Sequence, residues 1–153
     1  MSLVSEIQKV AKQYPESRSA ILPALRLAQE QYGWLSREAF EEVAEALELT
    51  PAYCMSVASF YDLFRLEPAG KHTIEVCTNV SCALVGAQKT LEAFEQELGI
   101  QPGETTADGE FTLRTVECYG GCGWGPVVAV DERYHEPVKP GDVPGIVQRL
   151  RDA

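Results

Sequence analysis

The sequence predicts a two-part α/β protein in which a small helical bundle precedes a sheet flanked by helices. Through roughly the first 66 residues, apolar side chains recur every three or four positions, the spacing of one helix face. The pattern then changes to strand-like alternation at Thr73–Val76. Between the two patterns lies Pro68-Ala69-Gly70, which has the composition of a linker. We therefore expect a helical domain over residues 1–68 and an α/β domain over residues 71–153.

Four short amphipathic helices are predicted in the first part. The first ends at Pro15, and the second begins near Ser17 and ends at Gly33, because glycine adopts the left-handed conformation at little cost. Ser36 and Thr50 have side chains that cap helix N-termini, so a third and a fourth helix should begin after them. The residues expected on the buried faces are Ile7, Val10, Ala11, Tyr14, Ile21, Ala24, Leu25, Ala28, Phe40, Val43, Ala44, Leu47, Cys54, Val57, Ala58 and Tyr61.

The second part alternates strands and helices. The predicted elements are a strand at Thr73–Val76 that leads into Cys77, a helix from Ala83 to Leu98, a strand at Phe111–Cys118, a hairpin of Val127–Val130 and Arg133–Glu136, and a last helix capped by Asp142. Leu84 should point inward with the rest of the apolar face of its helix. This order resembles the thioredoxin-like arrangement, a sheet flanked by helices.

Charge and hydropathy exclude several classes of protein. The net charge of −10, with no basic stripe, argues against nucleic-acid binding, which relies on Lys and Arg. No apolar stretch approaches the roughly 18 residues of a membrane span, and no basic run followed by an apolar core marks a signal peptide. We expect a cytoplasmic protein that does not insert into a membrane.

Five cysteines are the most informative feature of the composition. A reducing compartment disfavours structural disulfides, so clustered cysteines there more often bind metal or catalyse. Four of them form two pairs beside predicted strand ends, Cys77-x4-Cys82 and Cys118-x3-Cys122. Glycines crowd the second pair, and glycine lets backbone N–H groups approach the sulfides of an iron–sulfur cluster. The pairs therefore predict one [2Fe–2S] cluster held by four thiolates.

Other uses of four cysteines stay open at this point. A structural zinc site also takes four thiolates, although zinc knuckles more often show C-x2-C pairs. Two disulfides would need an oxidising compartment. A thiol–disulfide enzyme is a third alternative, but the sequence lacks the C-x2-C motif of such redox enzymes.

The remaining candidate residues are expected to be structural. Cys54 falls on an apolar helix stripe, where a free cysteine packs as a small hydrophobe. His72 and His135 are expected at the surface or at a sheet edge. Trp124 should shield the cluster or pack under the glycine-rich loop. No dinucleotide fingerprint, phosphate loop or nucleophile elbow is present, so the chain should lack an independent catalytic site and exchange electrons with a partner.

Longer stretches of the chain carry a family resemblance. They are Ile21-Leu22-Pro23-Ala24-Leu25, Gln31-Tyr32-Gly33-Trp34-Leu35, Ser59-Phe60-Tyr61, Cys77-Thr78-Asn79 through Cys82, and Glu117-Cys118 through Cys122-Gly123 with Pro126 after it. With these segments the chain resembles the thioredoxin-like [2Fe–2S] subunit of bacterial NADH-quinone oxidoreductase, which is respiratory complex I. The resemblance covers nearly the whole length.

The resemblance implies a place in an electron-transfer complex. The chain would be a subunit of that oxidoreductase, peripheral on the cytoplasmic side of the membrane, and would pack against a flavoprotein subunit that binds NADH and FMN. Its cluster would exchange single electrons with the FMN and ultimately serve quinone reduction. The same module occurs in NAD-linked formate dehydrogenases and hydrogenases, which the sequence does not separate. Ser81 and Gly121 depart from the common pattern, in which proline and alanine are frequent, but the four cysteines are intact.

Overall fold

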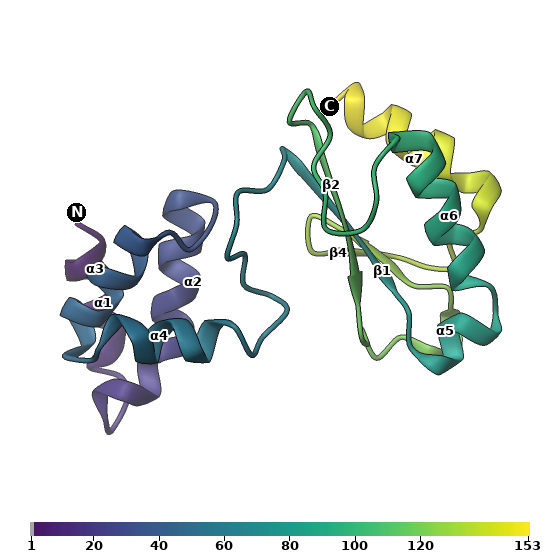
Figure 1. The fold of residues 1–153 in the computed structure, drawn as a ribbon. Coiled ribbons are helices and arrows are strands. Elements are labelled where there is room, and N and C mark those ends of the chain that lie inside the picture. Colours follow the sequence, from purple (N-terminus) through teal and green to yellow (C-terminus); the bar gives the residue numbers. More distant parts are fainter. Residues whose placement is uncertain (1) are drawn as a thin grey trace. The chain divides into compact units, whose positions relative to one another are not determined.

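The computed structural model describes residues 2–153, which form two compact units, one ending at Pro68 and the other beginning at Ala69. The first unit contains only helices, and the second contains a four-stranded sheet with helices (Figure 1). The predicted order, a helical part before an α/β part, is confirmed.

The helices of the first unit are α1 (Leu3–Ala11), the 3₁₀ turn η1 (Ser17–Ala20), α2 (Ile21–Tyr32), α3 (Arg37–Leu47) and α4 (Pro51–Ala58). The starts of α3 and α4 and the end of α2 are where local signals predicted. The Ser36 hydroxyl accepts a hydrogen bond from the Ala39 N–H, and the Thr50 hydroxyl accepts one from the Tyr53 N–H. Gly33 ends α2 with φ +78°, the left-handed conformation expected of it.

Two predictions for this unit are wrong. The helix α1 ends at Ala11, four residues before Pro15. Tyr14 and Tyr61, expected on buried faces, are exposed, because they lie beyond the ends of α1 and α4.

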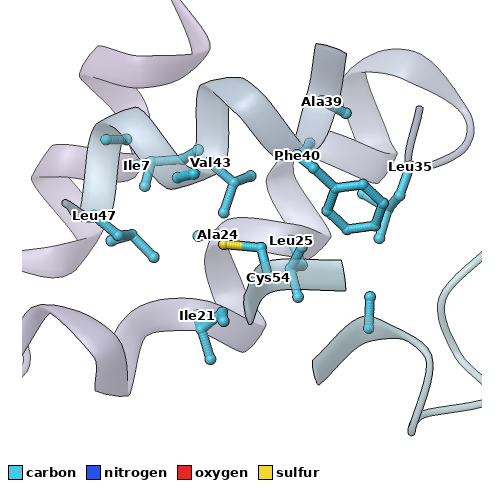
Figure 2. Close-up of a cluster of buried hydrophobic side chains, with 14 of the residues drawn as sticks. Ile7, Ile21, Ala24, Leu25, Leu35, Ala39, Phe40, Val43, Leu47 and Cys54 are labelled. Carbon is cyan, nitrogen blue, oxygen red and sulfur yellow. The ribbon is translucent and has the colours of Figure 1, made fainter. Parts of the chain in front are cut away.

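These helices enclose one apolar core, in which Cys54 is fully buried (Figure 2). Burial raises the pKa of the Cys54 thiol, so this cysteine stays a neutral packing residue. The prediction that Cys54 packs rather than reacts is confirmed. The other large side chains of this core are Leu3, Ile7, Leu25, Leu35, Phe40, Val43 and Leu47.

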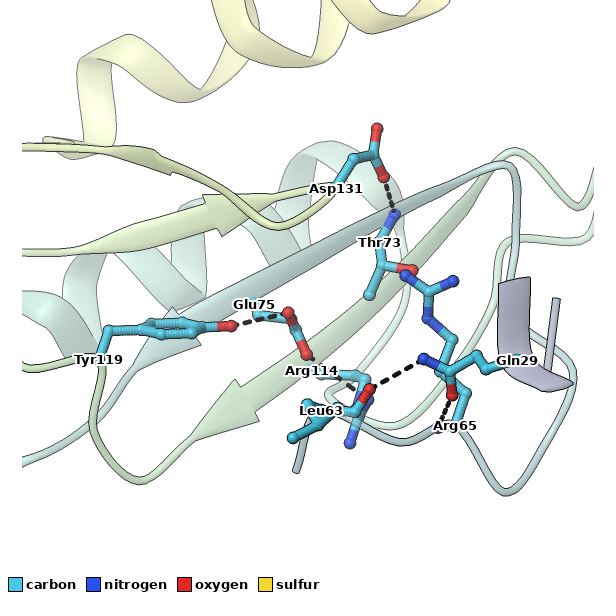
Figure 3. A network of polar contacts seen from close by, with 8 residues as sticks. All are labelled: Gln29, Leu63, Arg65, Thr73, Glu75, Arg114, Tyr119 and Asp131. Carbon is cyan, nitrogen blue, oxygen red and sulfur yellow. Dashed lines mark hydrogen bonds and ion pairs between the residues drawn. The ribbon is translucent and has the colours of Figure 1, made fainter. Parts of the chain in front are cut away.

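One buried polar side chain fixes the segment that follows α4. The Gln29 amide donates to the Leu63 carbonyl at 3.0 Å and accepts from the Arg65 N–H at 2.6 Å (Figure 3). A buried amide without these partners would be costly, so the pair of bonds holds residues 63–65 against α2.

The sheet of the second unit has the strand order β2-β1-β3-β4. Strands β1 and β2 are parallel, whereas β3 is antiparallel to both β1 and β4. The elements are β1 (His72–Cys77), α5 (Val80–Leu84), α6 (Ala87–Leu98), β2 (Phe111–Val116), η2 (Cys122–Trp124), β3 (Val128–Val130), β4 (Arg133–His135), η3 (Pro140–Asp142) and α7 (Val143–Arg151).

The two faces of this sheet differ. Ile74, Val76 and Leu113 point to the face that packs against α6 and α7, which lie on the same side of the sheet (Figure 1). Because side chains alternate along a strand, Glu75 and Cys77 point to the opposite face.

The predicted helix from Ala83 to Leu98 is wrong at its start. The chain forms the short α5, turns at Gly86 with φ +103°, and begins α6 at Ala87. Leu84 is consequently 82% exposed instead of inward, and Cys82 lies inside α5 instead of in a loop. The helical spacing of apolar residues continues across Gly86, so the sequence pattern does not reveal that α5 and α6 are separate helices.

The prediction of a surface position is also wrong for His72. It lies on the inner strand β1, is buried, and its Nδ1 is 2.7 Å from Asp131 Oδ2. Asp131 also accepts from the Thr73 N–H at 2.9 Å, so its carboxylate joins the β3–β4 turn to β1 (Figure 3). His135 lies on the edge strand β4, as predicted.

Candidate metal centre

The two cysteine pairs leave the sheet at the same edge. Strands β1 and β2 are parallel and in register, with Cys77 opposite Val116. Cys77 is the last residue of β1, and Cys118 follows two residues after the end of β2. Carboxyl ends of adjacent parallel strands lie side by side, so the topology brings the two pairs to one place.

The first pair is held rigidly. The Cys77 N–H donates to the Val127 carbonyl at 3.0 Å, which fixes its backbone to the chain just before β3. The Asn79 side chain accepts from the Val80 N–H at 2.9 Å and starts the single helical turn that carries Cys82. Both sulfur-bearing residues are 2% exposed, in a buried group with Ala87 and Val127.

The second pair lies in a glycine-rich loop and is exposed. Gly120 adopts φ +75°, and its N–H donates to Cys118 Sγ at 3.3 Å. An N–H directed at a sulfur favours the thiolate that binds iron. At Gly121, a Cβ would lie 2.9 Å from Val127 Cγ2, which explains the absence there of the alanine frequent in the resembling family.

The structure places Cys82 near two of the other predicted ligands. Cys82 lies within electrostatic range of the sulfurs of Cys77 and Cys122. Burial raises the pKa of the Cys82 thiol, and the Cys77 sulfur raises it further. For Cys118 no such interaction is described within residues 2–153; the hydrogen bond described for it is the one that its sulfur accepts from the Gly120 N–H.

The residues present fit an iron–sulfur cluster. All five cysteines are free, so the four thiols of the two pairs are available as ligands. Within residues 2–153, no three His, Cys, Asp or Glu side chains are grouped closely enough to hold one metal ion. A [2Fe–2S] cluster takes one pair of thiolates on each iron, and the chain offers two pairs. Gly125 provides the space over Cys82, because a Cβ there would lie 3.3 Å from Cys82 Sγ.

Apolar side chains surround the pairs. We call Val80, Leu84, Val85 and Trp124 the apolar rim; all four are exposed. Val85, beyond α5, reaches the loop of the second pair, since its Cγ2 is 3.0 Å from the Cβ position of Gly125. Trp124 is 65% exposed, so the prediction that it packs under the glycine-rich loop is wrong. An exposed apolar group of this kind marks an interaction surface.

Tyr119 lies between the two cysteines of the second pair, and the sequence alone did not identify it as a functional residue. Its hydroxyl donates to Glu75 Oε2 at 2.7 Å (Figure 3). Burial, and then the Glu75 carboxylate, raise the pKa of Tyr119 far above its ordinary value, so the phenol remains a donor. No local motif joins residues 75 and 119; only the register of the strands does.

Comparison with known proteins gives matches along nearly the whole chain. The family description "Thioredoxin-like [2Fe-2S] ferredoxin" matches residues 7–151. An NADH-quinone oxidoreductase subunit of Rhizobium meliloti (strain 1021) is 42% identical over 153 residues, which are all of this chain and 91% of that protein. NADH-quinone oxidoreductase subunit 2 of Thermus thermophilus is 42% identical over 143 residues, 92% of this chain and 79% of that protein.

A solved structure shares the fold at lower identity. A chain of an NAD⁺-reducing [NiFe]-hydrogenase, in the air-oxidised state, superposes with a TM-score of 0.76 at 23% identity. The alignment covers 86% of this chain but only 23% of that chain, so the likeness concerns one part of a longer polypeptide. Within residues 2–153, no helix has both the length and the apolar character needed to cross a membrane.

Proposed function

The chain belongs to the thioredoxin-like [2Fe–2S] ferredoxin family, and its cofactor is accordingly one [2Fe–2S] cluster; we propose that the two cysteine pairs hold that cluster. The chain then acts as an electron-transfer subunit. The ligands are Cys77 and Cys82 on one iron, and Cys118 and Cys122 on the other. The observation that supports the assignment is the parallel register of β1 and β2, whose carboxyl ends lead into the two pairs of free cysteines at one edge of the sheet.

In this proposal the two cysteine pairs have different roles. When bound, the cluster accepts and releases one electron at a time. The buried pair, fixed by the Cys77 backbone and by α5, anchors one side. The exposed pair, Cys118 and Cys122, faces outward, so electrons enter and leave on its side.

The partner we propose is a flavoprotein subunit that binds NADH and FMN. The apolar rim is the surface that such a partner would cover, which would also exclude water from the exposed pair. Relatives named as NADH-quinone oxidoreductase subunits, at 42% identity, support a complex that ultimately reduces quinone. Within it, the chain's proposed place is peripheral, on the cytoplasmic side of the membrane. The hydrogenase likeness supports the fold and does not change this choice of acceptor.

The cluster is tested on anaerobically purified protein. We expect a red-brown sample with about two irons per chain and a rhombic S = 1/2 EPR signal after reduction by dithionite. The variant C118A should lose the cluster, whereas C54A, which removes a cysteine from the helical core, should retain it. A colourless, EPR-silent protein with stoichiometric zinc would reject electron transfer and favour a structural zinc module.

The partner is tested with the flavoprotein subunit of the same organism. NADH should generate the S = 1/2 EPR signal of this chain's cluster in the reconstituted pair and leave the isolated chain unchanged, because in this proposal NADH and FMN bind to the partner. Replacing Trp124 by Gln on the apolar rim should weaken the pair without changing the iron content. Equal binding by W124Q and the wild type would remove this residue from the proposed surface.

A further inference from the structure

Tyr119 ties the exposed ligand loop to the sheet. Of the hydrogen bonds described for residues 118–125, the two that reach a strand are both made by Tyr119. Its hydroxyl donates to Glu75 Oε2 on β1 at 2.7 Å, and its carbonyl accepts from the Tyr134 hydroxyl on β4 at 3.3 Å. The rings of Tyr119 and Tyr134 also lie together, with centroids 5.0 Å apart. The loop's other hydrogen bonds, such as the one from Trp124 N–H to Gly121, stay within the loop.

The strand register places these partners in one row. Arg114, Glu75, Ala129 and Tyr134 are directly opposite one another across β2, β1, β3 and β4. Residues opposite one another share a face of the sheet, and this face is the one turned away from α6 and α7. Ala129, the smallest member, stands between Glu75 and Tyr134, where a larger side chain would obstruct an aromatic ring that contacts both.

The Tyr119 side chain also borders the buried surroundings of the first cysteine pair. Tyr119 packs against the group that contains Cys77 and Cys82. Glu75 lies two residues before Cys77 on the same face, about 7 Å along the strand. Tyr119 therefore connects the two cysteine pairs without carrying a ligand atom itself.

The Glu75 carboxylate is poorly solvated and depends on hydrogen-bond donors from the protein. Its side chain is 13% exposed, and its second oxygen is 3.5 Å from the Arg114 guanidinium. A carboxylate with so little access to water needs its donors, so movement of Tyr119 away from Glu75 is opposed. The loop needs such a restraint because its glycines, including Gly120 at φ +75°, leave the backbone many alternative conformations.

We propose that Tyr119 is a positioning residue that, through Glu75, holds the Cys118–Cys122 loop in register with the buried cysteine pair. It thereby limits the rate of iron loss and contributes to the reduction potential. The inference rests on the proposed function, since it presupposes that the four cysteines bind the cluster.

The test compares Y119F with a matched control in the holoprotein. Tyr32 also donates its hydroxyl to a glutamate, Glu42, at 2.7 Å, but in the helical unit. Y119F and Y32F thus remove the same group from bonds of the same length. We expect iron release to a chelator to be roughly tenfold faster in Y119F, as loss of a hydrogen bond to a charged group implies, and unchanged in Y32F.

The reduction potential separates positioning from a general loss of stability. In Y119F the Glu75 carboxylate loses a donor, so its negative charge is less compensated and the potential should fall. E75Q removes that charge while keeping an oxygen acceptor for Tyr119, so the potential should rise and iron release should stay near the wild-type rate. General destabilisation would not shift the two potentials in opposite directions.

Each outcome decides a different claim. A wild-type protein without a cluster refutes the proposed function itself. A wild-type protein with its cluster, but equal iron release and equal potential in Y119F and Y32F, overturns the role of Tyr119 and leaves the cluster assignment standing. If Y119F does not fold, Y134F, altered at an exposed side chain that donates to the Tyr119 carbonyl, is measured instead; iron release no faster than in the wild type then overturns the inference.

Discussion

Replacing Gly125 by alanine should disturb the metal centre from a position that carries no ligand. The added Cβ would lie 3.3 Å from Cys82 Sγ, 3.5 Å from Cys82 Cα and 3.0 Å from Val85 Cγ2. The backbone itself accepts alanine, because φ −62° and ψ 158° are ordinary extended values. Any effect must therefore come from these contacts.

Two opposing contributions set the magnitude. Alanine restricts the unfolded chain more than glycine does, which stabilises the fold by about 0.4–1 kcal/mol where the native backbone permits it. Overpacking costs about 1–3 kcal/mol in a rigid surrounding. Val85 is 58% exposed and can move aside, whereas Cys82 is 2% exposed and would be attached to iron. We expect the free energy of unfolding to fall by about 1 kcal/mol, mainly because the added Cβ displaces the Cys82 sulfur.

The assay measures iron content, visible circular dichroism and thermal unfolding of the anaerobically purified G125A holoprotein. Iron content should fall and the visible spectrum should shift, because both depend on the placement of the sulfur. G123A is the matched control: it lies in the same loop, and its added Cβ meets no atom within 4 Å. If G125A and G123A have equal iron content, spectra and unfolding midpoints, Gly125 does not cradle the ligand and the argument from its contacts is refuted.

Two further substitutions test the packing of each unit. C54S buries a hydroxyl at a fully buried position and should lower the free energy of unfolding by about 1–3 kcal/mol with unchanged iron content; denaturant titration and iron analysis decide, and iron loss in C54S or C54A would place Cys54 in the metal centre. G70A would bring a Cβ within 2.9 Å of the Gly109 carbonyl oxygen and the Phe111 nitrogen, backbone atoms that cannot rotate aside, so a loss of about 2–3 kcal/mol is expected in thermal unfolding. Its control is G141A, where no atom lies within 4 Å, and equal midpoints for the two would contradict the close approach.

Local signals accounted for the parts of the fold that neighbouring residues determine. Ser36 and Thr50 cap helices, and Gly33 ends one, because these effects need only residues a few positions away. The Asp131-Glu132 hairpin was predicted for the same reason, and both residues have positive φ. The break at Gly86 was missed because Leu84 continues the apolar spacing of α6 although it belongs to a separate turn.

Features that depend on register could not be predicted. His72 was expected at the surface, yet β1 lies between β2 and β3, and its partner Asp131 is 59 positions away in the chain. The bond between Glu75 and Tyr119 spans 44 positions and requires that Glu75 face away from the helices. A shift of one residue in the pairing of β1 would reverse that orientation.

The same register also explains why one cysteine pair is buried and the other exposed. Cys77 is still a strand residue, hydrogen-bonded to Val127, so it is enclosed by its neighbours in the sheet. Cys118 comes two residues after β2 has ended, where the chain has already left the sheet. The two strands are equally long, so the surroundings differ because Cys77 is the last residue of its strand whereas Cys118 lies two residues beyond the end of its strand. In the proposed function, the buried pair retains iron while the exposed pair exchanges electrons, which requires that the exposed loop be held in place. The two hydrogen bonds described between residues 118–125 and the strands are both made by Tyr119.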